Sequence, residues 1–285
     1  MEVYVPGSTV IFGQTDDPNT AGYEPQETPG TVRFDPGVSY ELMIRPDGTD
    51  DDLAQAGEAL QSVPAVDRVV LSSSAMTQRG FRHLLRLPWL REFASSYVAD
   101  AGLDTVRKLS ALRVLKLSTA DVTDRGLAKL AGMPELRELW LDHTQIGDVG
   151  LSHLRELRAL EDLYLDECTN VTDRGVAALA DLPSLKFVGL QYCWRITARG
   201  LDALRAMPAL KTVGLCRPAS FKVRLLRKFG IVGKIIYGTF SDAALDQLIE
   251  ARPDCEVNLA VNHEIIQEMI DAEEAAEVRA RRRGE

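Results

Sequence analysis

The sequence predicts an α/β fold: a solenoid of right-handed strand–turn–helix repeats, with a parallel sheet on the concave side and helices on the convex side. Three observations support this prediction. A similar sequence motif recurs at Leu112, Leu136 and Leu160, and a fixed period of this kind is typical of stacked repeats. Each motif opens with alternating apolar residues, which indicates a short strand. Each then continues with apolar residues at helical spacing.

The apolar framework shows how far the repeats extend. We count about seven or eight units, with atypical units at both ends acting as caps, because a stack must close its core at each end. A shortened unit lies at Leu90 and Phe93, and a weaker first unit begins at Leu42 and Ile44. The strand positions that we expect to face the core are Val66, Val69 and Leu71; Leu112, Leu115 and Leu117; Leu136, Leu139 and Leu141; Leu160, Leu163 and Leu165; Leu185, Val188 and Leu190; and Leu210, Val213 and Leu215.

Turn and helix signals follow the strands. Thr123–Asp124 and Thr172–Asp173 carry side-chain oxygens that accept hydrogen bonds from the free N–H groups at the start of a helix. Glycines recur just inside each helix and indicate close backbone packing there, at Gly126, Gly150, Gly175 and Gly200. Prolines then end the helices, at Pro88, Pro134, Pro183 and Pro208, because proline disfavours a helical residue before it.

These spaced positions resemble leucine-rich repeats, and the wording VTDRGLAxL is similar to the cysteine-containing subclass found in bacterial and F-box-type proteins. The resemblance covers roughly Val66 to Leu215. It implies a concave parallel sheet, convex helices, and a role in binding another macromolecule. It implies no particular activity, since one fold serves many functions.

The chain divides into five expected regions. Residues 1–30 form a loosely ordered N-terminal arm or an edge strand, and residues 31–64 form a cap and degenerate first repeat, with a strand at Tyr40–Ile44 and a helix at Asp51–Leu60. Residues 65–216 hold the repeats. Residues 217–260 hold a basic segment and a capping repeat, and residues 261–285 hold a charged helix.

Composition narrows the class of protein. The 285 residues carry a net charge of -9, which argues against nonspecific nucleic-acid binding and favours a basic partner. No apolar run approaches the roughly 20 residues of a membrane span, and the start of the chain lacks the pattern of a signal peptide. We therefore expect a cytoplasmic protein with no transmembrane segment.

Two of the four cysteines, Cys168 and Cys193, are predicted to be structural, and Cys216 and Cys255 are isolated. Cys168 and Cys193 occupy one position in successive repeats, where Ala120 and Thr144 stand in others, so a small buried residue is the ordinary requirement there. There is no CxxC pair. We expect reduced core thiols rather than disulfides or a metal site.

The basic segment 217–239 allows two interpretations. Its lysines and arginines alternate with Phe, Leu, Ile and Tyr, as in segments that make weak contact with a membrane surface or a polyanion. The favoured interpretation is that the apolar residues pack into the end of the solenoid while the charged heads stay in water.

The candidate site lies among the outward-facing strand residues of the middle repeats. Aligned by repeat, one column reads Lys116, Trp140 and Tyr164, and exposed aromatics of this kind are enriched at protein interfaces. The hypothesis is that aromatic residues anchor a partner and that carboxylates around them favour Lys or Arg. The proposed partner-binding residues are Trp140, Tyr164, Phe187, Tyr192, Glu138, Asp142, His143, Asp162, Asp166 and Glu167. The alternative is that these aromatics only cover the sheet or pack under the N-terminal arm or C-terminal helix.

The sequence thus predicts a non-enzymatic recognition, adaptor or scaffold module, with a regulatory subunit and a hydrolase centred on His143 as the alternatives. A regulatory subunit would engage its partner through the N-terminal arm or the C-terminal helix. A hydrolase would use Thr119, His143 and Glu167, which align in successive repeats as hydroxyl, imidazole and carboxylate, but a flat sheet lacks oxyanion donors. A metal held by Asp142, His143 and Asp166 has no ligand spacing beyond the repeat. No GxxxxGKS, GxxxxGKT or HExxH motif is present, so we expect no enzyme and no cofactor.

Overall fold

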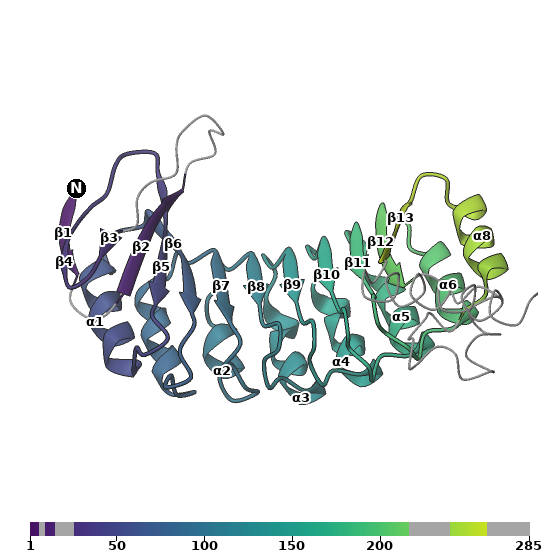
Figure 1. Cartoon of the computed structure of the whole chain (residues 1–285), viewed down its shortest axis with the longest axis horizontal. Helices are drawn as coiled ribbons and strands as arrows, with labels where there is room; N and C mark the ends of the chain where they lie inside the picture. Colours follow the sequence, from purple (N-terminus) through teal and green to yellow (C-terminus); the bar gives the residue numbers. More distant parts are fainter. Residues whose placement is uncertain (6–8, 15–25, 217–239, 261–285) are drawn as a thin grey trace, which may run out of the picture.

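A computed structural model describes residues 1–5, 9–14, 26–216 and 240–260 of the chain. These residues form an arc with strands along its inner side and helices along its outer side (Figure 1). The basic segment 217–239 and the charged helix expected in residues 261–285 lie outside the described residues. The expectations about them, including the membrane or polyanion contact and the regulatory role of that helix, stay predictions.

One sheet of eleven strands runs through the described part of the chain, in the order β13-β12-β11-β10-β9-β8-β7-β6-β5-β2-β3. From β5 to β13 every neighbouring pair is parallel, as the repeats predict. The strands are β2 (Thr9–Gln14), β3 (Gln26–Glu27), β5 (Ser39–Ile44), β6 (Val66–Leu71), β7 (Glu92–Ser95), β8 (Val114–Lys116), β9 (Glu138–Trp140), β10 (Asp162–Tyr164), β11 (Phe187–Gly189), β12 (Thr212–Cys216) and β13 (Glu256–Ala260).

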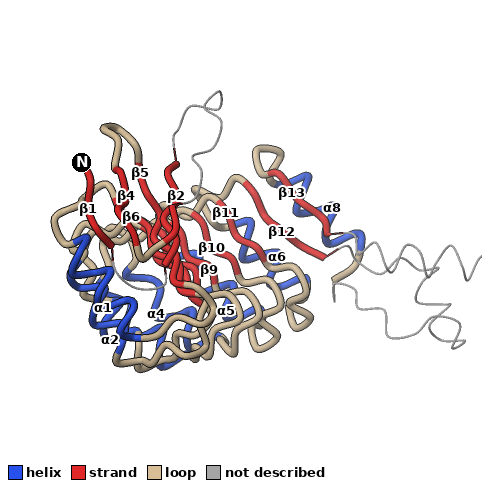
Figure 2. Tube along the Cα trace, turned by 60° about the vertical axis from the view of Figure 1, so that its left-hand side comes forward, coloured by secondary structure: helices blue, strands red, loops and turns tan. Residues whose placement is uncertain are grey.

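Short helical segments cover the other face of this sheet (Figure 2). They are α1 (Asp50–Leu60), η1 (Gly80–Arg86), α2 (Leu103–Val106), α3 (Asp124–Leu127), η2 (Ala128–Gly132), α4 (Asp148–His153), η3 (Leu154–Glu156), α5 (Asp173–Ala178), η4 (Leu179–Asp181), α6 (Ala198–Arg205) and α8 (Asp242–Ala251), where η marks a 3₁₀ helix. Several repeats thus join a short α-helix to a 3₁₀ turn where the apolar spacing predicts one helix. The tighter winding of the 3₁₀ turn brings the chain back to the next strand within a short repeat.

The core is a continuous column of leucines between the sheet and the helices. Leu115, Leu139 and Leu163 come from neighbouring strands and have no exposed surface, as expected from the strand pattern. Cys168 and Cys193 are buried free thiols, which agrees with the prediction of small core residues. Burial raises the pKa of the Cys168 thiol, so the thiol form is favoured there.

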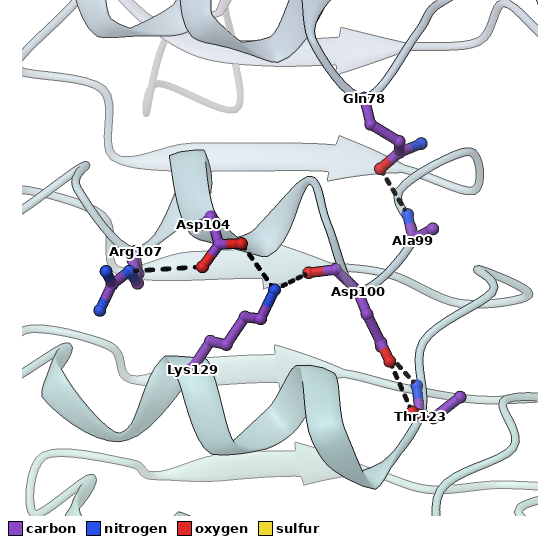
Figure 3. Close-up of polar contacts among 7 residues, drawn as sticks. All are labelled: Gln78, Ala99, Asp100, Asp104, Arg107, Thr123 and Lys129. Atoms are coloured by element: carbon purple, nitrogen blue, oxygen red, sulfur yellow. Dashed lines mark hydrogen bonds and ion pairs between the residues drawn. The ribbon is translucent and has the colours of Figure 1, made fainter.

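An aspartate ladder joins the start of each helix to the next repeat. Asp100 accepts hydrogen bonds from the backbone N–H and hydroxyl of Thr123, at 2.8 and 2.6 Å (Figure 3). The carboxylate also lies over the glycine inside the next helix, because a Cβ added to Gly126 would stand 2.2 Å from Asp100 Oδ1. Asp148 and Asp173 make the same contacts two and three repeats on. The expected close packing at these glycines is therefore packing against an aspartate.

The described residues of the N-terminal arm form short strands. They include β1 (Glu2–Val5), which pairs antiparallel with β4 (Gly30–Arg33), and β2, which pairs antiparallel with β5. Val5 and Ile11 are fully buried. The arm thus covers the open edge of β5, which matches the alternative of an edge strand and removes free N–H and C=O groups from that edge.

The C-terminal elements continue the sheet as the sequence predicts. The segment after residue 240 forms α8 and then β13, which pairs parallel with β12. Arg252, at the end of α8, donates hydrogen bonds to the carbonyl oxygens of Met207 at 2.8 Å and Leu210 at 2.7 Å. These bonds tie the last unit to the loop that precedes β12.

Candidate functional site

Three aromatic side chains form a row across the middle of the concave face. Trp140 on β9, Tyr164 on β10 and Phe187 on β11 are each half-buried, and we call them the aromatic row. The rings of Trp140 and Tyr164 are stacked, with centroids 3.9 Å apart and planes 17° apart. The rings of Tyr164 and Phe187 are 4.7 Å apart and tilted by 39°. The structure therefore brings together three of the four aromatics that the sequence proposed as an anchor.

The stacking determines which part of each ring a partner would meet. Neighbouring strands lie about 4.8 Å apart, close to the ring separations, so the rings stand up from the sheet face to face. Their edges turn toward the open side. The Lys116 ammonium covers one face of Trp140, 5.5 Å from the ring centroid. The same ammonium lies 2.5 Å from Glu92 Oε1. A cation from a partner would thus find carboxylates more accessible than ring faces.

Two carboxylates stand beside the aromatic row on the same strands. Glu138 accepts a hydrogen bond from the indole N–H of Trp140 at 2.5 Å. Burial raises the pKa of Asp162, and the neighbouring Glu138 and Glu161 raise it further. Burial and the surrounding carboxylates also raise the pKa of the Tyr164 hydroxyl. The row thus lies in a region of negative potential, as the sequence predicts.

The second acidic group, Asp142, Asp166 and Glu167, lies where β9 and β10 end, and we call it the acidic edge. Asp142 Oδ1 accepts from the backbone N–H of Asp166 at 2.9 Å, and Asp166 Oδ1 accepts from that of Gln191 at 2.7 Å. Asp166 leans over Gly189, where a Cβ would come within 3.0 Å of Oδ1. This burial, with the nearby Asp142 and Glu167, raises the pKa of Asp166 to about 6.

The trio considered for a hydrolase occupies a left-handed turn that the sequence did not reveal. Thr119, His143 and Glu167 have φ of 62°, 56° and 62°, and the N–H of each donates to a carbonyl of the following repeat. His143 Nδ1 lies 3.1 Å from Glu167 Oε2, so two of the three side chains meet. Thr119 and His143 are exposed. The repeat geometry explains why these positions align, and the open surface does not exclude water as acyl transfer needs.

The remaining candidates lie apart from the aromatic row or form no metal site. Tyr192 packs edge-on against Trp194, with centroids 5.3 Å apart, and so belongs to a second aromatic pair beyond the acidic edge. Within the residues that the structure describes, no three His, Cys, Asp or Glu side chains are arranged to hold a metal ion. In that same part of the chain, no helix is long and apolar enough to cross a membrane.

Comparison with known proteins shows a likeness to solved structures. No family model matches the sequence, and no curated protein matches it. Among solved structures, an internalin from Listeria monocytogenes is similar, with 14% sequence identity, a TM-score of 0.46, and coverage of 72% of this chain. This chain covers 57% of the internalin chain.

Some features of the face were beyond sequence reasoning. The contact of Lys116 with both Trp140 and Glu92 joins three repeats, and only their alignment in the sheet brings them together. Asp166 likewise lies over Gly189 only because the sheet aligns their two repeats. A signal was present in the column that reads Val70, Ala94, Lys116, Trp140, because small residues followed by large ones predict an uneven surface.

Proposed function

We propose that this chain is a non-enzymatic recognition module that binds another protein through its concave face, as an adaptor or scaffold. The main support for this proposal is the aromatic row of Trp140, Tyr164 and Phe187, which is stacked, half-buried and bordered by carboxylates. Aromatic side chains are the commonest energetic anchors of protein interfaces. A core role does not explain them, because the leucines beneath them already fill the space between sheet and helices.

The charge around the row supports a partner with Lys or Arg on its surface. Asp162 and Asp166 have raised pKa values because they are partly buried and lie near other carboxylates. A partner cation would relieve this repulsion and favour the ionised carboxylates. Complementary charge of this kind increases specificity and the rate of association.

Packing under the N-terminal arm is the main alternative for the aromatic row, and the described strands of the arm argue against it. In the arm, β1 pairs with β4 and β2 pairs with β5. Trp140 lies on β9, and β6, β7 and β8 separate that strand from β5. The described arm therefore covers the edge of the sheet rather than its centre.

The test is capture of a partner by a variant that lacks two rings. Replacing Trp140 and Tyr164 with Ala removes half-buried rings but no core leucine, so the variant should stay folded and lose capture from the native host. Tyr4→Ala is the matched control, because Tyr4 is 62% exposed on β1, away from the concave centre. Capture should fall as salt is raised, since exposed charges are screened. Unchanged capture by the double variant would exclude the aromatic row as the binding surface.

A further inference from the structure

A hollow adjoins the aromatic row on the side of Trp140. In the column that carries Trp140, Lys116 comes directly before it, and the two units before Lys116 have Ala94 and Val70. These smaller side chains leave a space of about 320 Å³. Its lining includes Val70, Ala94, Tyr97, Lys116, Ser118 and Trp140. The hollow is open to the concave side and is continuous with the aromatic row through Trp140.

The lining suits one apolar side chain. Val70 and Ala94 are half-buried and form an apolar floor, and Trp140 borders the hollow with the Lys116 ammonium over its ring. Lys116 holds its ammonium against Glu92, which leaves its methylene groups to line the space. The volume lies at the lower end of the range of about 300–1,000 Å³ for ligand sites, so it matches a side chain better than a cofactor.

The hollow is linked to the acidic edge by a hydrogen bond. Ser118 lines the hollow and its hydroxyl donates to Asp142 Oδ2 at 3.0 Å. Asp142 and Asp166 follow β9 and β10, two and three strands beyond β7, which carries Ala94. At about 4.8 Å per strand, this corresponds to roughly 10–14 Å across the sheet. An extended peptide at about 3.3 Å per residue covers that distance in three or four residues.

We propose that the hollow receives a large apolar side chain, such as Leu, Met or Phe, from an extended segment of the partner protein, and that an Arg or Lys three or four residues away on that segment pairs with Asp142 and Asp166. This inference rests on the proposed function, and it adds the chemistry and spacing of the partner's contact residues. The apolar side chain displaces water from Val70, Ala94 and Trp140. The basic side chain meets the carboxylates of Asp142 and Asp166.

A displayed library of random dodecapeptides is the probe, selected on the full-length chain. Ala94→Leu fills the hollow, and Val70→Phe fills it from the neighbouring strand, so a folding defect in one variant does not remove the test. Asn258→Leu is the matched control: Asn258 is exposed, and the strand register places it in the same column as Ala94, on β13. Thermal melting establishes that each variant is folded.

The expected result is enrichment of peptides with an apolar residue and a basic residue three or four positions apart. Their affinity should fall at least tenfold for Ala94→Leu and Val70→Phe and should be unchanged for Asn258→Leu. Peptides that require Trp140 and Tyr164 but bind equally to the filled variants would overturn this inference and leave the proposed function in place. Peptides that require neither the rings nor the hollow would overturn both. Binding that appears only after the basic residues of 217–239 are replaced would assign the hollow to this chain's own segment and also overturn the inference.

Discussion

Asp148 provides the strongest test of the aspartate ladder that joins the repeats. Its Oδ1 accepts from the backbone N–H groups of Thr172 at 2.8 Å and Gly175 at 2.9 Å, and its Oδ2 accepts from the Thr172 hydroxyl at 2.6 Å. In Asp148→Ala these bonds are lost and two backbone N–H groups at the start of α5 lose their acceptor. Hydrogen bonds to charged groups contribute about 1.5–3 kcal/mol each, and the three bonds share one carboxylate that is only partly buried.

We therefore expect Asp148→Ala to lower the free energy of unfolding by about 3 kcal/mol, less than the sum of three separate bonds. For a domain of this size that loss corresponds to a fall in melting temperature of roughly 6–12 °C. Asp148→Asn keeps an oxygen for the two N–H groups and should lose about 1 kcal/mol. Asp181→Ala is the control, because Asp181 is exposed at the end of η4 and should change stability by less than about 0.5 kcal/mol.

The assay is urea unfolding followed by circular dichroism, with the midpoint and the slope fitted separately. Contacts in a solenoid connect neighbouring repeats only, so loss of the ladder is also expected to lower the slope or divide the transition into two. If Asp148→Ala shifts the free energy by less than about 1 kcal/mol and leaves one transition of unchanged slope, the ladder does not couple the repeats.

Two further predictions concern a carboxyl group and a pair of glycines. Because the pKa of Asp166 is raised to about 6 in the folded state, above an unfolded value of about 3.9, its ionisation opposes folding, and the penalty develops as pH rises from about 4 to 6. The melting temperature of Asp166→Asn, which keeps an acceptor for Gln191, should therefore rise relative to the wild type over that interval; a constant difference would contradict the shift. Gly150→Ala should destabilise the chain by about 2 kcal/mol or more, since its Cβ would stand 2.4 Å from Asp124 Oδ1 and 3.1 Å from the Asp124 Cα. Gly132→Ala, with no atom within 4 Å of the new Cβ, should be neutral or stabilising by up to about 1 kcal/mol, and equal melting temperatures for the two alanine variants would refute the packing argument.

The sequence was sufficient to predict which residues of the candidate site lie on neighbouring strands, but not which of their side chains make contact. Alternation within each strand and the repeat period were enough to place Trp140 and Tyr164 side by side on the open face, and the structure confirms that neighbourhood. Phe187 lies two residues before Gly189, in the column of Asp162, yet its ring lies 4.7 Å from that of Tyr164 on the neighbouring strand. Tyr192 was grouped with these rings by sequence but packs against Trp194, since the left-handed backbone at Tyr192 turns its side chain away from the strand direction.

Periodicity alone was sufficient to assign the strands, the helical segments and the core leucines, because one face of every unit must be buried against its neighbours and the spacing records which face that is. The spacing does not show which side chains of neighbouring repeats contact each other. The bonds from Asp100 to Thr123 and from Asp142 to Asp166, the burial that raises the pKa of Asp166, and the hollow beside Trp140 all arise from side chains that are distant in sequence. They exist only because the stacked strands bring equivalent positions within about 4.8 Å of one another, and that proximity is a property of the tertiary structure.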